Sequence, residues 1–180
     1  GLWFGKKVRI VDSQLDVRDA ASGRNGGGLY AAAGLEFANG RLLFENCRAK
    51  MAGGGVFSGS DIVLIGKALT LRRCITTGAG GGIYVAAGSL TRSGPSQVED
   101  CYARGGGDIA FVQGNITLAE TVITGSSRSL HANGHVHIDT LNCARASSAC
   151  YVTGHANLVV ARAATCPRGA GFYKLGIREG

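Results

Sequence analysis

Apolar and polar positions alternate in short runs along the whole chain, and these runs return at a regular interval. A dipeptide of an apolar residue and a second, often aromatic residue recurs seven times, and its interval is longer in the first half of the chain than in the second. The seven copies are Leu29-Tyr30, Val56-Phe57, Ile83-Tyr84, Ile109-Ala110, Leu130-His131, Cys150-Tyr151 and Phe172-Tyr173. A repeat of this length predicts stacked units, each burying one face on the next.

Each unit contains short segments with the period of two that is typical of β-strands. In the first strand, alternation places one residue of each dipeptide on one face (Leu29, Val56, Ile83, Ile109 and Leu130) and its partner on the other. Second and third strands are indicated by pairs such as Leu35 and Phe37, and Leu42 and Phe44. This pattern predicts an all-β, single-stranded, right-handed parallel β-helix, a solenoid of about seven rungs, each of roughly 20–27 residues.

The repeat also divides the chain. Residues 1–24 are expected to form an N-terminal cap and a partial rung, and residues 25–180 the β-helix. Rungs are long over 25–108 and short over 109–180, where the second and third strands nearly merge. The last rung starts at Phe172-Tyr173 and is incomplete, so we expect a protein partner or further rungs to cover this end.

Composition and charge indicate which partners the protein could bind and whether it could span a membrane. The 30 glycines include three Gly-Gly-Gly runs, at 26–28, 53–55 and 80–82, where tight turns are needed. The net charge of +7 favours acidic partners, and an acidic polysaccharide is one candidate. The basic residues are scattered over the rungs without a nucleic-acid motif, so we expect no nucleic-acid partner. No apolar run is long enough for a transmembrane segment.

The segment from Phe44 to Phe57 carries a family resemblance. It contains Phe-x-x-Cys followed by Gly53-Gly54-Gly55-Val56, and it resembles the repeats of polymorphic outer-membrane-type β-helix proteins, in which Asn stands at the position of Cys47. The resemblance covers about residues 20–110. It implies a β-helix of the pectin-lyase-like kind in a secreted or cell-surface setting, with a structural or adhesive role, and it brings no catalytic residues.

A column of cysteines keeps the same interval as the dipeptides. Cys47, Cys74, Cys101, Cys143 and Cys166 belong to it, with Thr121 in the shortened rung, whereas Cys150 lies in another column. We interpret the column as a core ladder of reduced thiols that pack as small apolar side chains. Inter-rung disulfides are the alternative, because neighbouring strands lie within disulfide range. The chain has no Cys-x-x-Cys pair, and no cofactor is indicated.

Three further groups of residues are candidates for chemistry. His135, His137 and His155 would share an outward face and could bind zinc, copper or nickel, or could simply be solvated. Asp100 and Glu120 would stack as an acid and a base, with Arg73 nearby, or would be inter-rung charge pairs. An outer aromatic strip could stack on sugar rings, or could cover neighbouring strands (Tyr30, Phe57, Tyr84, Tyr151 and Tyr173).

The sequence names no reaction, and we therefore favour a non-enzymatic function. The leading hypothesis is a β-helix domain with a structural, adhesive or assembly role in a larger protein or complex. The alternative is a β-helix that binds or processes a polysaccharide through the outer aromatic strip. A surface metal site at the histidines is the third hypothesis. An extracellular or cell-surface location is favoured by the resemblance.

Overall fold

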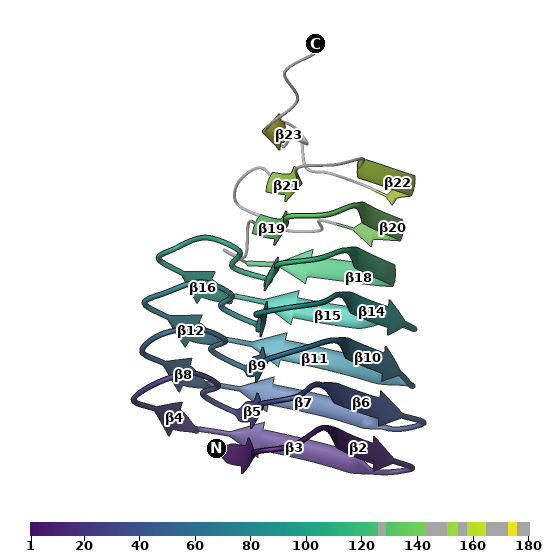
Figure 1. The fold of residues 1–180 in the computed structure, drawn as a ribbon. Coiled ribbons are helices and arrows are strands. Elements are labelled where there is room, and N and C mark those ends of the chain that lie inside the picture. The colour runs from purple at the N-terminus through teal and green to yellow at the C-terminus, as the bar shows by residue number, and fades with distance from the viewer. Residues whose placement is uncertain (126–128, 143–150, 155–157, 165–172, 176–180) are drawn as a thin grey trace.

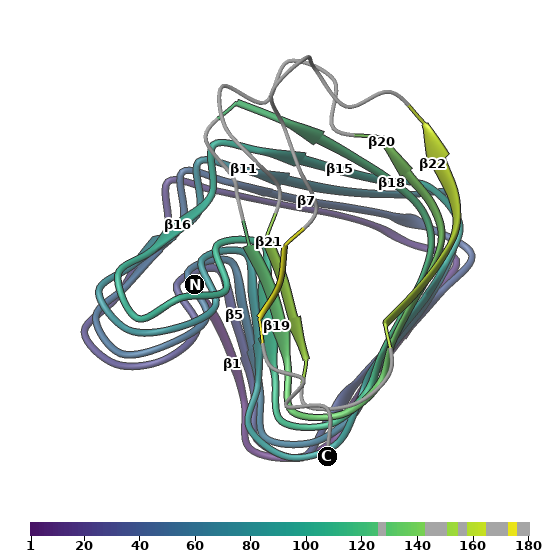
Figure 2. The same cartoon turned by 90° about the horizontal axis from the view of Figure 1, so that it is seen from above.

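The computed structural model describes residues 1–125, 129–142, 151–154, 158–164 and 173–175. Over these residues the chain is all-β, has no helix, and winds into a parallel β-solenoid (Figure 1). The stack has about five turns, fewer than the roughly seven rungs expected. Viewed from above, the chain runs counterclockwise while it rises toward the viewer, which is a right-handed winding (Figure 2).

The first sheet contains the dipeptide strands, which pair in parallel along the whole stack. Its order is β1 (Leu2–Phe4), β5 (Leu29–Ala31), β9 (Val56–Ser58), β13 (Ile83–Val85), β17 (Ala110–Val112), β19 (Ser129–Ala132), β21 (Tyr151–Gly154) and β23 (Tyr173–Leu175). Residues 1–24 thus contribute β1 to this sheet, where Trp3 pairs with Tyr30.

The second sheet has 11 strands in two ladders that merge. One ladder is β2 (Val8–Val11), β6 (Leu35–Ala38), β10 (Ile62–Ile65) and β14 (Leu90–Ser93). The other is β3 (Gln14–Arg18), β7 (Arg41–Glu45), β11 (Ala68–Arg72) and β15 (Ser96–Glu99). Both end on β18 (Ile116–Thr124), which is followed by β20 (Val136–Asn142) and β22 (Leu158–Ala164). The two strands of a long rung therefore become one strand where the rungs shorten.

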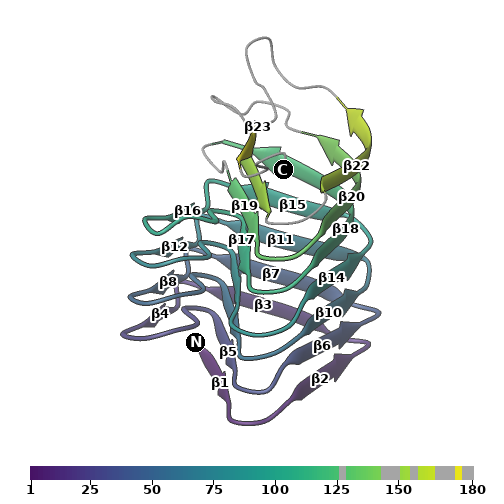
Figure 3. The same cartoon turned by 45° about the horizontal axis from the view of Figure 1, so that its top comes forward.

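A third, four-stranded sheet projects from the stack and was not predicted. It consists of the two-residue strands β4 (Ala21–Ser22), β8 (Arg48–Ala49), β12 (Ile75–Thr76) and β16 (Tyr102–Ala103). We call these strands and the loops that follow them the arm (Figure 3). Strands this short cannot produce a recognisable alternation, so the sequence indicated only a turn here.

The core consists of apolar columns that run along the solenoid axis. Register places Leu29, Val56 and Ile83 on one another, and Phe44, Leu71 and Val98 likewise, all buried. Full burial of such side chains contributes about 1.5–3 kcal/mol each. The prediction for Ile109 was wrong by one position, because Ala110 pairs with Ile83 and with Leu130. This register brings Phe111 opposite Tyr84, where the two rings stack.

The Gly-Gly-Gly runs form the return from the arm to the first sheet. The first glycine of each run has a positive φ, 67° at Gly53, which glycine adopts without strain. The second lies against the next rung, where a Cβ on Gly54 would collide with the carbonyl oxygen of Gly81. Glycine is thus required both by the turn and by the close spacing of the rungs.

Among the residues that the structure describes, none belong to a helix that could cross a membrane.

Candidate functional site

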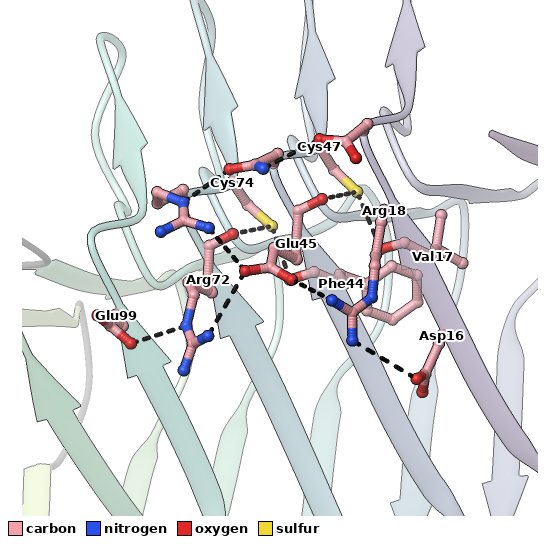
Figure 4. Close-up of polar contacts among 12 residues, drawn as sticks. Asp16, Val17, Arg18, Phe44, Glu45, Cys47, Arg72, Cys74 and Glu99 are labelled. Carbon is pink, nitrogen blue, oxygen red and sulfur yellow. Dashed lines mark hydrogen bonds and ion pairs between the residues drawn. The ribbon is translucent and has the colours of Figure 1, made fainter.

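Among the described residues of the second sheet, the side chain with the most ion pairs is Glu45, at the end of β7 (Figure 4). Its carboxylate is 10% exposed and is shared by three arginines of the rungs on either side. Oε2 accepts a hydrogen bond from Arg18 Nη1 at 2.9 Å, and Oε1 accepts from Arg73 Nη2 at 2.6 Å and from Arg72 Nη1 at 3.5 Å. Glu45 therefore ties three successive rungs together.

The same column continues beyond Glu45 with alternating charge. Arg72 Nε donates to Glu99 Oε2 at 2.8 Å, so the order along the stack is Arg18, Glu45, Arg72 and Glu99. The carboxylate of Glu99, with a smaller effect from Glu45, raises the pKa of Arg72. These carboxylates are engaged by guanidinium groups, an arrangement that joins rungs and offers no free base.

The proposed acid and base do not lie together. Asp100 follows Glu99, which pairs with Thr124, whereas Glu120 lies toward the other end of β18, just before Thr121, which pairs with Ser96. The predicted stack of Asp100 on Glu120 is wrong, because it assumed an interval of 20 residues, whereas Ser96 pairs with Thr121, an interval of 25, and the interval falls to 20 only between Ala110 and Leu130. The same register removes Thr121 from the cysteine column.

Arg73, the third member of that proposed site, lies in a strained turn. It has a φ of 50°, as do the equivalent residues Asp19, Asn46 and Asp100 within a few degrees. Asp and Asn tolerate this left-handed conformation, but an arginine rarely adopts it. Arg73 Nε donates to Asn46 Oδ1 at 2.7 Å, and the side chain also reaches Glu45, so its contacts extend to the preceding rung.

Three cysteines form a buried ladder beside the charged column. Cys47, Cys74 and Cys101 are free thiols with no exposed surface. The Sγ of Cys74 donates to the carbonyl oxygen of Phe44 at 3.4 Å, and that of Cys47 to the carbonyl oxygen of Glu45 at 3.5 Å (Figure 4). Cys143, Cys150 and Cys166 lie outside the described residues.

Packing in the ladder makes the thiols of Cys47 and Cys74 harder to deprotonate. Hydrogen bonding to Cys74, together with burial, raises the pKa of the Cys47 thiol, and hydrogen bonding to Cys101 together with burial raises that of Cys74. Because the thiolate is the reactive form, these two side chains are unreactive at neutral pH. They pack as small apolar groups between the second sheet and the arm.

The aromatic column is a continuous stack of rings along the first sheet. It runs from Trp3 through Tyr30, Phe57, Tyr84 and Phe111 to His131, with centroid separations of 4.3–6.1 Å and interplanar angles of 3–18°. Sequence reasoning missed Trp3 and Phe111, although each lies one long-rung interval from the neighbouring ring. Phe111 was missed because the prediction aligned Ile109, and not Ala110, with Ile83.

Stacking covers the ring faces inside the column and so limits which of these rings can bind a sugar. A sugar packs on the face of an aromatic ring, and both faces of Phe57 are covered by Tyr30 and Tyr84. The exception is Trp3, which is 72% exposed and lines a cleft of about 400 Å³ with Tyr30 and the loop residues Ser22 to Asn25. At the other end, Tyr151 pairs with Ser129 and with Tyr173, so Tyr151 is two positions out of register with His131.

The histidines are distributed over different environments. His131 ends the aromatic stack, and His137 on β20 has its Nε2 2.9 Å from Asp139 Oδ1. The backbone N–H of His135 donates to Asn115 Oδ1, and His155 lies outside the described residues. The shared outward face of His135 and His155 was expected from a register with Val136 opposite Ala156, and this register is wrong, since Val136 pairs with Leu158. No group of three or more potential ligands that could hold a metal occurs within the described ranges.

One charged residue lies inside the solenoid and was missed. Arg92 is 3% exposed and occupies the core column between Leu64 and Leu118. Its guanidinium donates to the carbonyl oxygens of Leu64, Gly66, Ser93 and Pro95 and to Ser96 Oγ. Desolvation lowers its pKa. The spacing of Leu90-x-Arg92, which matches Ile62-x-Leu64, was the available signal.

Comparisons with known proteins give no match for this chain, whether with protein-family models, with curated sequences or with solved structures.

Proposed function

We propose that this chain is a structural β-solenoid, a scaffold that serves an adhesive or assembly role within a larger protein or complex. One observation carries the proposal: the side-chain columns that could have formed an active surface are used in contacts between rungs. The faces of Phe57 are covered by its neighbours, Glu45 is shared by three arginines, and the thiols of Cys47 and Cys74 are buried.

The proposal is tested by measuring stability and sugar binding on the same variants. Replacing Phe57 by Ala removes two stacking contacts and leaves a cavity, and we expect a loss of about 3–5 kcal/mol of unfolding free energy. Phe57→Leu keeps most of the volume and should cost less. A Phe57→Leu variant with unchanged stability and abolished binding on a glycan array would refute the structural proposal.

A second candidate function is saccharide binding at Trp3, and the exposed cleft at this residue favours it. One face of the indole packs on Tyr30, with centroids 6.1 Å apart, and the ring remains 72% exposed. Titration of the protein with oligosaccharides tests this candidate. Binding that is lost in Trp3→Ala but kept in Tyr84→Leu would support it, because Tyr84 lies inside the stack.

A further inference from the structure

The outer face of the arm carries exposed cations. Arg48 on β8 points away from the buried Ala49, and Lys50 follows it on the same side. Arg104 lies two rungs further along the stack, at the position equivalent to Lys50, whereas Arg24, in the loop that follows β4, lines the cleft beside Trp3. Rungs are about 4.8 Å apart, so Arg48, Lys50 and Arg104 extend over roughly 10 Å of the solenoid axis.

These cations lack the carboxylates that neutralise the second sheet. On that sheet Arg18, Arg41 and Arg72 all form ion pairs. On the arm, no ion pair links Arg24, Arg48, Lys50 or Arg104 to any carboxylate of the described residues. Two carboxylates, Asp19 and Asp100, lie in the turn that precedes the arm. Asp19 accepts a hydrogen bond from Asn46, and Asp100 is likewise engaged in a contact.

Exposed apolar surface accompanies the cations. Tyr102 on β16 is 53% exposed and shares a register column with Arg48 and Ile75. Met51, next to Lys50, is 57% exposed. Cations beside exposed aromatic and aliphatic groups suit a ligand that carries both anionic groups and apolar C–H surface.

We propose that the outer face of the arm binds an acidic polysaccharide chain that lies along the solenoid axis. Carboxylate or sulfate groups on successive sugars would pair with Arg48, Lys50 and Arg104, and sugar C–H groups would pack on Tyr102. Arginine suits such groups because its planar fork binds them in a bidentate manner. The face is one short strand wide, and the strands of the arm carry one exposed aromatic ring, Tyr102, which fits a saccharide chain better than the stacked bases of a nucleic acid.

The test compares two variants that each remove two exposed charges. Arg48→Gln/Lys50→Gln removes two cations of the arm, and Lys6→Gln/Lys67→Gln removes two exposed lysines elsewhere that also lack ion pairs with described residues. Binding to immobilised heparin is measured against salt concentration, with dextran and a single-stranded DNA oligonucleotide as comparison ligands. We expect the arm variant to bind heparin at least about tenfold more weakly and to lower the salt slope by about two, while the control changes affinity less than about threefold.

A third variant separates sugar packing from charge. Tyr102→Ala should weaken heparin binding without changing the salt slope, because it removes contact surface and no cation. Three outcomes would overturn the inference: no heparin binding by the unmodified protein, an equal loss in the arm and control variants, or tighter binding to the oligonucleotide than to heparin. None of them bears on the scaffold proposal, which is decided by the Phe57 variants.

Discussion

Replacing Glu45 by glutamine should destabilise the solenoid by about 2 kcal/mol. Exposed ion pairs contribute about 0.2–1 kcal/mol each, and the three arginines of this cluster are 35–56% exposed. Burial of the Glu45 carboxylate places the two short contacts, at 2.6 and 2.9 Å, near the upper end of that range. Loss of the negative charge also leaves Arg72 and Arg73 next to each other without a shared counter-charge.

The assay is urea unfolding of the unmodified protein and of two Glu→Gln variants, in low salt and in about 1 M NaCl. Glu120→Gln is the matched control, because Glu120 is exposed on β18 and has no ion pair with a described residue. It should change stability by less than about 0.5 kcal/mol. The Glu45 effect should shrink in high salt, where charge interactions are screened. Equal effects of the two substitutions would refute the reasoning.

Three other substitutions or conditions have definite expected outcomes. Thr121→Val should stabilise the protein by about 1 kcal/mol, seen as a rise of about 2–4 °C in Tm, because the buried Oγ1 has no hydrogen-bond partner among the described residues; a lower Tm would contradict this. Stability measured by chemical unfolding should fall above about pH 9. Thiol hydrogen bonds and burial raise the pKa of Cys47 and Cys74 in the folded state, so above this pH only the unfolded chain loses these protons. The free energy of unfolding should then fall by about 1.4 kcal/mol per pH unit for each of the two cysteines. Cys47→Ala/Cys74→Ala should flatten this fall, and an unchanged slope would argue against it. Arg92→Lys should cost about 2–3 kcal/mol in the same unfolding assay, since an ammonium group cannot reach the acceptors on both sides of the turn; equal stability would show that the guanidinium contacts contribute little.

The sequence predicted the long rungs well because their interval is constant. Tyr30, Phe57 and Tyr84 lie in one column as expected, and Leu29, Val56 and Ile83 in another. A constant interval leaves only one register in which both columns stay in phase. The same interval would have placed Trp3 and Phe111 in the aromatic column, had it been extended in both directions.

Prediction failed where the rungs shorten. The run Ile109 to Val112 is apolar throughout, so the pattern alone accommodates two registers, and ring stacking of Phe111 on Tyr84 selects the one that forms. Ser96 pairs with Thr121, an interval of 25 residues, although Ala110 and Leu130 of the first sheet are only 20 residues apart, so the interval of the dipeptides did not give the register of β18. The arm was missed for a different reason, since its strands are too short to carry a periodicity.

The most direct test of the scaffold account is a double-mutant cycle between Tyr84 and Phe111, which lie on adjacent rungs and stack with centroids 5.4 Å apart. Unfolding free energies are measured for Tyr84→Leu, Phe111→Leu and the double variant, with Tyr84 and the exposed Tyr102 as a control pair. The account predicts a coupling of about 0.5–1.5 kcal/mol for the stacked pair and a value near zero for the control. Strictly additive effects of Tyr84→Leu and Phe111→Leu would contradict the claim that this column holds the rungs together.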